Sequence, residues 1–400
     1  RDVAPSRGLG DVYKRQRQKQ GIDILKLNTG NPATFGFGLP DSIKNALMEH
    51  MQDGVGYCDF KGMPQARQAI CDYETSKGIK GITPDDVFIG NGVSEVVSFA
   101  LTPLLNDGDE VLVPSPSYSL WGNSVYLEDG KPVFYTCDEQ ANWYPDIQDI
   151  RSKITDKTKA IVIINPNNPT GVLYPKEILL EIIQVAREFG LLIFADEIYD
   201  RLVMDGKQHI SLASLTEDVP VITLNGLSKS HCLCGYRCGW MVISGPRELT
   251  EDYRQGIIQL TSLRLCANTM AQIVIPAALD DMETPASMVR PGGRIYEQRE
   301  ATVRELEKID GLSFVKNDAA FYVFPKLDVK KFNITNDKQF AHDLLDATNI
   351  LLVPGSGFDW KDPDHFRIVM LPQADILSDA IRRMGTFPVS YTHLRAHETE

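Results

Sequence analysis

Residues 159–171 have the sequence KAIVIINPNNPTG, and this stretch decides the fold. It begins with an apolar, β-branched run of the length of a buried strand and ends in asparagine and proline residues, which are typical of an ordered turn. The same pattern, an apolar run followed by polar residues, recurs at 191–199 (LLIFADEIY) and at 221–229 (VITLNGLSK). These stretches predict buried strands of one sheet, each followed by a polar loop.

Other apolar runs of strand length lie on both sides of these stretches, at 87–90, 110–114 and 240–244. Between the strand candidates lie longer segments with apolar residues at helical spacing, notably 93–105 and 174–190. This alternation favours an α/β fold in which helices cover a mostly parallel sheet.

After residue 265 the pattern changes to that of a smaller α+β domain. It predicts, in order, helices at 268–279 and 295–309, strands near 314, at 321–324 and at 351–353, and a last helix at 374–386. A ligand between two such domains, at the carboxyl ends of the parallel strands, is the general expectation.

The composition excludes several classes of protein. Of the 400 residues, 43% are hydrophobic, and no apolar run is long enough to span a membrane as a helix. The formal net charge of −13 argues against a nucleic-acid partner. Seven cysteines, an odd number without disulfide-framework spacing, favour a reducing compartment, so we expect a cytoplasmic protein. Cys232, Cys234 and Cys238 lack a paired Cys-x-x-Cys spacing, and His231 does not complete a set of ligands, so no metal site is expected.

Both ends of the chain differ in character from its body. Residues 11–16 (DVYKRQ) and 389–399 (VSYTHLRAHET) resemble translated sequencing-adaptor sequence. We therefore expect 1–16 and 389–400 to be artefactual or disordered tails, with the natural chain running from about residue 17 to residue 388.

Two of the loops that follow strand candidates have groups suited to binding an oxygen-rich ligand. After 87–90, Gly92 opens a helix that begins with Val93 and Ser94, where free backbone N–H groups favour an anion such as a phosphate. A simple helix cap is the alternative. Asn168, in the turn after 159–164, is a candidate donor to a ligand oxygen or an ordinary turn residue.

Charged residues follow the other two strands. Asp196 ends a buried strand and needs a partner, which is a ribose hydroxyl, a pyridinium nitrogen or the cap of the next turn. Lys229 lies between two apolar strands, where a depressed pKa or a Schiff base is plausible and a solvated loop lysine is the alternative. Arg237, eight residues later, is able to hold a phosphate with both guanidinium nitrogens.

Five short motifs point to one family. They are, in order, Asn168-Pro-Thr-Gly171, Asp196-x-x-Tyr199, Ser228-Lys229, Gly235-x-Arg237 and Phe366-Arg367-Ile368. Together they resemble the fold-type I, class I/II aminotransferases, which use pyridoxal phosphate, over about residues 25–387. The resemblance implies a large domain (41–265) with a mostly parallel seven-stranded sheet between helices. It also implies a small α+β domain (266–388), with 17–40 as its N-terminal segment and substrate loop.

Longer stretches narrow the resemblance. Residues 27–37, 56–62, 262–268 and 291–299 are similar to those of bacterial glutamate–pyruvate (alanine) aminotransferases. This implies a ping-pong transfer of the amino group between L-alanine/pyruvate and L-glutamate/2-oxoglutarate. An aminotransferase for aspartate, aromatic or branched-chain substrates and a carbon–sulfur lyase remain alternatives within the fold.

Two readings from other classes are weaker. A regulator that senses the same cofactor is the non-enzyme alternative, but no basic helical segment of sufficient length precedes residue 25. A nicotinamide dehydrogenase lacks its G-x-G-x-x-G loop.

The resemblance also implies roles for individual residues around the cofactor. Lys229 would form the Schiff base and then move a proton between the substrate and the cofactor. Asp196 would pair with the pyridine nitrogen, Asn168 and Tyr199 would bond the phenolic oxygen, and Tyr118 would stack on the ring.

The remaining roles concern the phosphate, the substrate and a second subunit. The phosphate would lie on the N–H groups of Val93 and Ser94, with Ser228, Arg237 and Tyr57 of a second subunit, which requires a homodimer with shared active sites. Gly30, Asn168 and Arg367 would bind the substrate carboxylate, with Arg367 donating two hydrogen bonds to it. Arg264 is a candidate for the second carboxylate of glutamate, with an ordinary interface ion pair as the alternative.

Overall fold

The computed structural model describes residues 21–397, with side chains up to residue 387. The tail expected at 1–16 and the last three residues lie outside the described residues. The last helix, α15 (Ala374–His397), continues past residue 388.

An eight-stranded sheet forms the centre of the larger part of the molecule. Its spatial order is β2 (Val87–Asn91), β9 (Cys238–Ser244), β8 (Val221–Gly226), β7 (Leu192–Asp196), β6 (Thr158–Ile164), β3 (Glu110–Ser115), β4 (Lys131–Asp138) and β5 (Tyr144–Pro145). Only β9 and β5 run antiparallel to their neighbours. The predicted α/β fold with a mostly parallel sheet is confirmed, with eight strands rather than seven because the two-residue β5 extends the edge.

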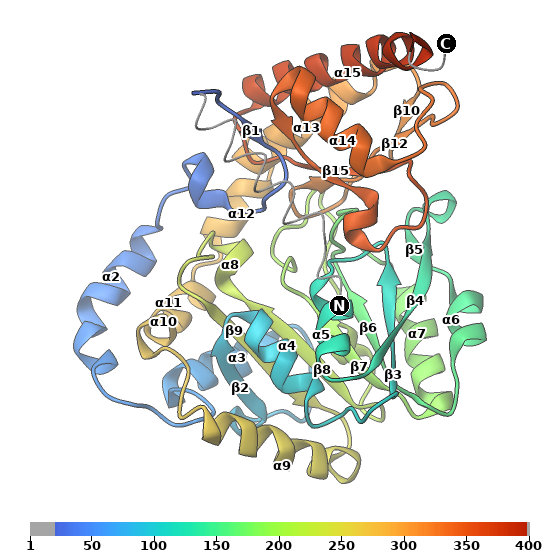
Figure 1. Cartoon of the computed structure of the whole chain (residues 1–400). Helices are drawn as coiled ribbons and strands as arrows, with labels where there is room; N and C mark the ends of the chain where they lie inside the picture. Colours follow the sequence, from blue (N-terminus) through green and yellow to red (C-terminus); the bar gives the residue numbers. More distant parts are fainter. Residues whose placement is uncertain (1–20, 398–400) are drawn as a thin grey trace.

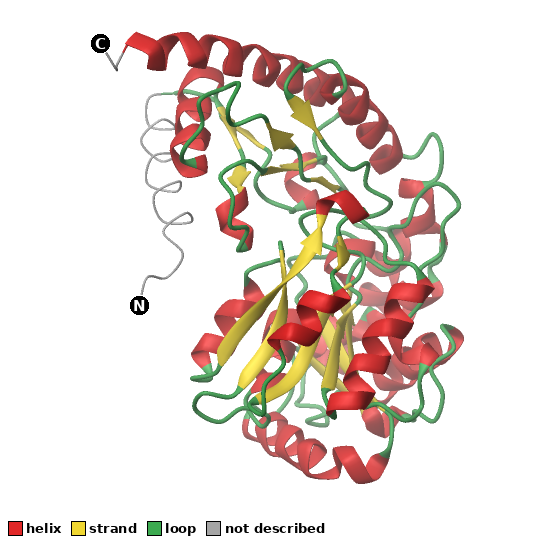
Figure 2. Ribbon diagram, turned by 90° about the vertical axis from the view of Figure 1, so that its right-hand side faces the viewer, coloured by secondary structure: helices red, strands yellow, loops and turns green. Residues whose placement is uncertain are grey.

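Helices cover both faces of this sheet, as Figure 2 shows. Side chains alternate along β6, so Ile161 and Ile163 face one helical layer while Val162 and Ile164 face the other. The first layer contains α6 (Ile147–Lys153) and α7 (Lys176–Phe189), and the second contains α4 (Val93–Leu101), α5 (Leu120–Leu127) and α9 (Arg247–Leu263). Strands β6 and β7, in the middle of the sheet, are largely apolar because both of their faces are buried.

A third group of helices packs against the β2 edge. It contains α2 (Asp41–His50), α3 (Pro64–Ser76), α10 (Thr269–Ile273) and α11 (Ile275–Asp280), whose apolar side chains share one cluster with β2 and β9. We predicted a single helix at 268–279, but Pro276 has no N–H to donate, and the segment forms two short helices instead. This packing continues beyond residue 265, where we expected the small domain to begin.

The smaller part of the molecule lies above the sheet in Figure 1. Its helices are α12 (Glu283–Val289), α13 (Arg294–Leu306), α14 (Asp337–Thr348) and α15, and its strands are β1 (Leu25–Lys26), β10 (Leu312–Ser313), β11 (Tyr322–Val323), β12 (Lys326–Leu327), β13 (Ile350–Leu351), β14 (Val353–Pro354) and β15 (Phe366–Val369). Strand β1 pairs with β13, so the N-terminal segment joins the C-terminal part. Among the described residues, no helix is both long and apolar enough to cross a membrane.

Candidate active site

Three neighbouring strands bring the predicted site residues together. Strands β8, β7 and β6 are adjacent and parallel, so their carboxyl ends meet at one edge of the sheet. Lys229 follows β8, Asp196 ends β7, and Asn168 lies in the turn after β6. The edge therefore combines a cation, a carboxylate and an amide.

Lys229 lies in the single helical turn α8 (Leu227–Ser230) and contacts the N-terminal segment. Its Nζ donates a hydrogen bond to the backbone carbonyl of Gly30, 2.9 Å away, and lies 6.0 Å from the centre of the Phe321 ring. Gly30 has no room for a side chain, because a Cβ there would overlap the hydroxyl of Tyr322. The amine is thus held against the N-terminal segment, which joins the smaller part of the molecule.

Asp196 is buried and close to other polar groups. Burial raises the pKa of its carboxyl to about 6, although hydrogen bonds from Trp121 and from the backbone of Ile198 and the positive charge of Lys229 oppose this shift. The Nε1 of Trp121 donates to Oδ2 at 3.1 Å, and the N–H of Ile198 donates to Oδ1 at 3.3 Å. A cation bound here would favour the ionised carboxylate.

Arg367 connects the smaller part of the molecule to the turn after β6. Its NH1 donates to Oδ1 of Asn168 at 2.8 Å, and its NH2 donates to the carbonyl of Asn28 at 2.6 Å. The guanidinium also lies 4.6 Å from the ring of Tyr322, whose hydroxyl is 2.8 Å from that of Tyr199. The fork is thereby fixed in orientation, as recognition of a planar carboxylate requires.

A second cationic group lies at the N-terminus of α4. Gly92 precedes this nine-residue helix with a φ of +82°, and a Cβ there would overlap the guanidinium of Arg237. The N–H groups of Val93 and Ser94 come too early in the helix to have an intrahelical acceptor. Arg237 is exposed and donates to the carbonyl of Cys234 at 2.9 Å. These donors fit a phosphate-sized anion.

The remaining predicted residues are Tyr118, Ser228 and Tyr57. Tyr118 is half-buried, one turn before Trp121. The carbonyl of Ser228 accepts from the thiol of Cys234 at 3.0 Å. Tyr57 is 84% exposed, on the surface of the larger part.

Arg264 and the cysteines have partners elsewhere. Arg264 pairs with Glu95 of the same chain at 2.5 Å, so its charge is already engaged. The thiol of Cys238 donates to the carbonyl of Ala271, while that of Cys232 lies 3.9 Å from the sulfur of Met288, so these two thiols face different neighbours.

The sequence matches the family model described as aminotransferase class I and II over residues 22–381. The chain belongs to this family. A glutamate-pyruvate aminotransferase AlaA of Haemophilus influenzae is 50% identical over 384 residues, covering 96% of this chain and 95% of that protein.

Two solved structures are also similar to this aminotransferase. An aminotransferase from Escherichia coli has a TM-score of 0.95 and 46% identity, covering 97% of this chain and 96% of that one. An alanine aminotransferase from Pyrococcus furiosus has a TM-score of 0.89 and 41% identity, covering 94% and 95% of the two chains. The predicted family and fold are confirmed.

Sequence reasoning missed three residues that contact the predicted site residues. Trp121 bonds Asp196, Tyr322 bonds Tyr199, and the carbonyl of Asn28 holds Arg367. Trp121 follows Tyr118 by one helical turn, which was the only available signal. The contact of Asn28 is made by its backbone, so no residue type marks it.

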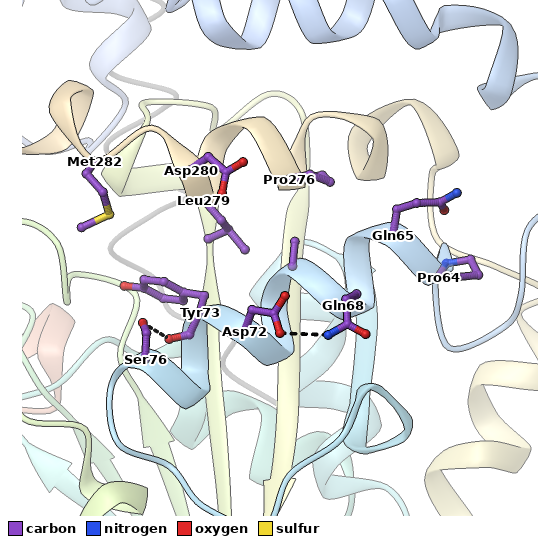
Figure 3. A pocket seen from close by; sticks show the side chains of 11 residues that line it. Pro64, Gln65, Gln68, Asp72, Tyr73, Ser76, Pro276, Leu279, Asp280 and Met282 are labelled. Carbon is purple, nitrogen blue, oxygen red and sulfur yellow. Dashed lines mark hydrogen bonds between the residues drawn. The ribbon is translucent and has the colours of Figure 1, made fainter.

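A hollow of about 740 Å³ lies away from these residues, between α3 and α11 (Figure 3). It is lined by Pro64, Gln65, Gln68, Ala69, Asp72, Tyr73, Ser76, Pro276, Leu279, Asp280 and Met282. None of the predicted site residues lines it. Tyr73 connects it to the interior, because its hydroxyl donates to Asp200 at 2.6 Å.

Proposed function

We propose that this aminotransferase uses pyridoxal phosphate and transfers the amino group between L-alanine/pyruvate and L-glutamate/2-oxoglutarate. The relative position of three charged residues supports the proposal. Lys229 and Asp196 lie at the carboxyl ends of the adjacent strands β8 and β7, and Arg367 of the smaller part bonds Asn168 in the turn after the next strand. The names of the relatives that cover the chain almost completely support the choice of substrates.

The residues of the site fit this cofactor chemically. Asp196 is a buried carboxyl whose pKa is raised by burial, so its ionised form needs a cation nearby. A protonated pyridine nitrogen would provide that cation. Val93, Ser94 and Arg237 would hold the phosphate, with Ser228 nearby, and Asn168 and Tyr199 would bond the phenolic oxygen; Tyr118 would cover the ring. When bound, pyridoxal phosphate supplies an electron sink for negative charge at the substrate Cα.

Lys229 is the proposed base and acid. Its Nζ would take the proton from the substrate Cα and return it to the cofactor carbon C4′. The hydrogen bond from Nζ to the carbonyl of Gly30 supports this role, because it places the amine next to the segment that would cover the substrate. The apolar ring of Phe321 beside Nζ limits the access of water.

Arg367 is the proposed receptor of the substrate α-carboxylate. Asn168 and the carbonyl of Asn28 hold its guanidinium, so the side chain loses little conformational freedom when a carboxylate binds. The backbone around Gly30 would close over the substrate. Together these groups fix the Cα–H bond relative to Lys229.

We also propose a cytoplasmic homodimer with shared sites. Tyr57, which is 84% exposed in one chain, would reach the phosphate in the partner's site. All seven cysteines are free, as a reducing compartment requires. Sedimentation tests the oligomeric state. Mixing Tyr57→Phe and Lys229→Ala chains tests whether the sites are shared, because part of the activity is restored only if Tyr57 of one chain acts in the site of the other.

Product analysis tests the substrate assignment. The purified chain with cofactor, L-alanine and 2-oxoglutarate should form pyruvate and glutamate in equal amounts. Formation of product only with aspartate, aromatic or branched-chain amino acids would favour another specificity. Release of ammonia and pyruvate from cystathionine would indicate a lyase, and cofactor binding without turnover would favour a regulator.

A further inference from the structure

A cluster of buried charges lies behind the predicted site. The side chain of Lys77, 13% exposed, directly follows α3, and its Nζ lies 2.7 Å from Glu74, 2.7 Å from Glu197 and 3.2 Å from Asp200. The three carboxylates are between 0% and 3% exposed. One ammonium therefore faces three acidic groups that water does not reach.

The ammonium makes this cluster possible. Burial raises the pKa of Glu74. Burial also acts to raise the pKa of Asp200, but the attraction of Lys77, together with His209, Arg201 and the hydrogen bond from Tyr73, keeps it below its ordinary value. Burial tends to lower the pKa of Lys77, but the carboxylates raise it well above its usual range. Removing one member of such a group leaves a buried charge without compensation, which is costly.

The other polar neighbours of the cluster do not replace Lys77. Burial lowers the pKa of His209, whose Nε2 is 4.0 Å from Glu197, so this ring is neutral at pH 7. The guanidinium of Arg201 lies over the ring of Tyr73 and donates to two backbone carbonyls. Glu197, Asp200 and His209 are spaced like metal ligands, but the Nζ of Lys77 already places a cation between the two carboxylates.

The cluster is linked directly to the site through β7. Glu197 follows Asp196 in the chain, and its Oε1 accepts hydrogen bonds from the hydroxyl of Ser211 at 2.9 Å and the backbone N–H of Leu212 at 3.0 Å. Asp200 follows Tyr199. Lys77 therefore contacts Glu197 and Asp200, the residues that immediately follow the predicted cofactor-binding residues Asp196 and Tyr199.

A second link runs to β8. The Nδ2 of Asn225 donates to Oδ2 of Asp200 at 2.7 Å, and its Oδ1 accepts from the N–H of Gly226 at 2.7 Å. Gly226 is the N-cap residue of the helical turn that contains Lys229. A continuous series of polar contacts thus runs from Lys77 to the backbone that supports the proposed catalytic lysine.

We propose that Lys77 is a positioning residue of the active site, whose ammonium ties the ends of β7 and β8 together and so fixes Asp196, Tyr199 and Lys229 relative to one another. The inference deepens the proposed function and rests on it for the roles of these three residues. Lys77 itself touches none of them. By compensating Glu197, it also limits the negative charge next to Asp196.

The electrostatic part of this role predicts the direction in which the pKa of Asp196 shifts when Lys77 or Glu197 is replaced. Lys229, Glu197 and Tyr199 are titratable groups that interact electrostatically with Asp196, and the negative charge of Glu197 raises the pKa of Asp196. Loss of the ammonium leaves Glu197 uncompensated, so Asp196 should take up a proton at a higher pH. Replacement of Glu197 by glutamine should have the opposite effect.

The test measures the Kd for pyridoxal phosphate as a function of pH, from the visible band of the bound cofactor. Tight binding requires ionised Asp196, so Kd should rise below the pKa of that residue. We expect Lys77→Met to raise Kd at neutral pH at least 10-fold and to move this rise to higher pH, and Glu197→Gln to move it to lower pH. Lys77→Arg should keep Kd within about 3-fold of wild type.

Lys80→Met is the matched control, because Lys80 is 70% exposed, lies three residues away and pairs with Glu217 at the surface. It should change neither Kd nor its pH dependence. A folded Lys77→Met chain with a Kd within twofold of wild type would overturn the proposal, as would shifts of the two variants in the same direction. If Lys77→Met does not fold, an unchanged pH dependence in Glu197→Gln overturns it.

No substrate is needed for this test. A wild-type chain that binds the cofactor but does not react with alanine therefore contradicts the proposed function alone. A change in Kd for Lys77→Met would still support the positioning role.

Discussion

Trp121 and Asp196 lie 75 residues apart in the chain and meet in the core, where the indole Nε1 donates a 3.1 Å hydrogen bond to the carboxylate. This bond and the N–H of Ile198 favour the ionised carboxylate, yet burial still raises the pKa of Asp196 to about 6. The protein thus holds a carboxylate that is costly to ionise until a cation binds beside it. Predictions about stability and about cofactor binding follow from this relationship.

Asp196→Asn should stabilise the chain in the absence of cofactor while abolishing efficient turnover. The folded chain binds the Asp196 proton more tightly than the unfolded chain, so the free energy of unfolding should fall as the pH rises from about 4 to about 6. Above about pH 6 the loss of stability should stay constant. A shift of about two pKa units corresponds to about 3 kcal/mol. Urea unfolding at pH 5 and pH 7.5 should show a fall for wild type that Asp196→Asn lacks. The exposed Asp252→Asn is the control, and equal pH dependence in all three chains would contradict the prediction.

Trp121→Phe should weaken cofactor binding in a pH-dependent way. The variant retains the aromatic packing against Phe194, whose ring centre is 5.3 Å away, but removes the donor to Asp196. The pKa of Asp196 should rise further, and the pH below which the visible band of the cofactor is lost should rise by about 0.5 to 1 unit. A pH titration measures this directly. An unchanged titration in a folded variant would show that the indole donor does not act on Asp196.

Gly92→Ala and Arg237→Met should separate folding from anion binding. Alanine at position 92 combines an unfavourable φ of +82° with an overlap with Arg237, so it should cost about 1–3 kcal/mol of stability and also weaken cofactor binding. Arg237 is exposed, so its replacement should change stability by less than about 0.5 kcal/mol. Loss of its charged hydrogen bonds should raise the Kd for pyridoxal phosphate about 10- to 100-fold. Thermal unfolding and cofactor titration of both variants test this, and a normal Kd for Arg237→Met would remove Arg237 from the phosphate site.

Arg367→Met should impair substrate binding and leave cofactor binding nearly intact. The guanidinium is held by Asn168 and by the carbonyl of Asn28, and a lost bidentate pair is worth about 3 kcal/mol. The KM for both amino acids and both oxo acids should therefore rise about 100-fold. Arg290→Met is the control, because Arg290 is 59% exposed and pairs with Glu283 at the surface. A substrate-specific rise in KM, for glutamate alone, would instead place Arg367 at the side chain of the substrate.

The elements that the sequence predicted well are those with a uniform environment. Strand β6 is buried on both faces, so its apolar run was visible in residues 159–164. Strand β4 was missed because Lys131 and Asp138 occupy its exposed ends and its interior is only partly buried. The break between α10 and α11 depends on Pro276 within a segment whose apolar spacing is otherwise helical.

The site was predictable where one residue type carries the chemistry. Lys229, Asp196 and Arg367 are charged residues next to apolar runs in the sequence, and this pattern can be recognised without a structure. The bond between Tyr199 and Tyr322 and the bond between Lys229 and the carbonyl of Gly30 depend on how two distant segments pack. Lys77 gave no signal, since a lysine after a helix is ordinarily solvated and its three carboxylates are distributed over two segments.

The visible spectrum of the chain with pyridoxal phosphate tests the central claim most directly. A band from cofactor joined to Lys229 should appear, disappear on addition of L-alanine and return with 2-oxoglutarate, and Lys229→Ala should not form it. This cycle would establish both half-reactions of the proposed exchange. A band that forms but does not respond to alanine or glutamate would contradict the substrate assignment, and an identical band in Lys229→Ala would contradict the role of the lysine itself.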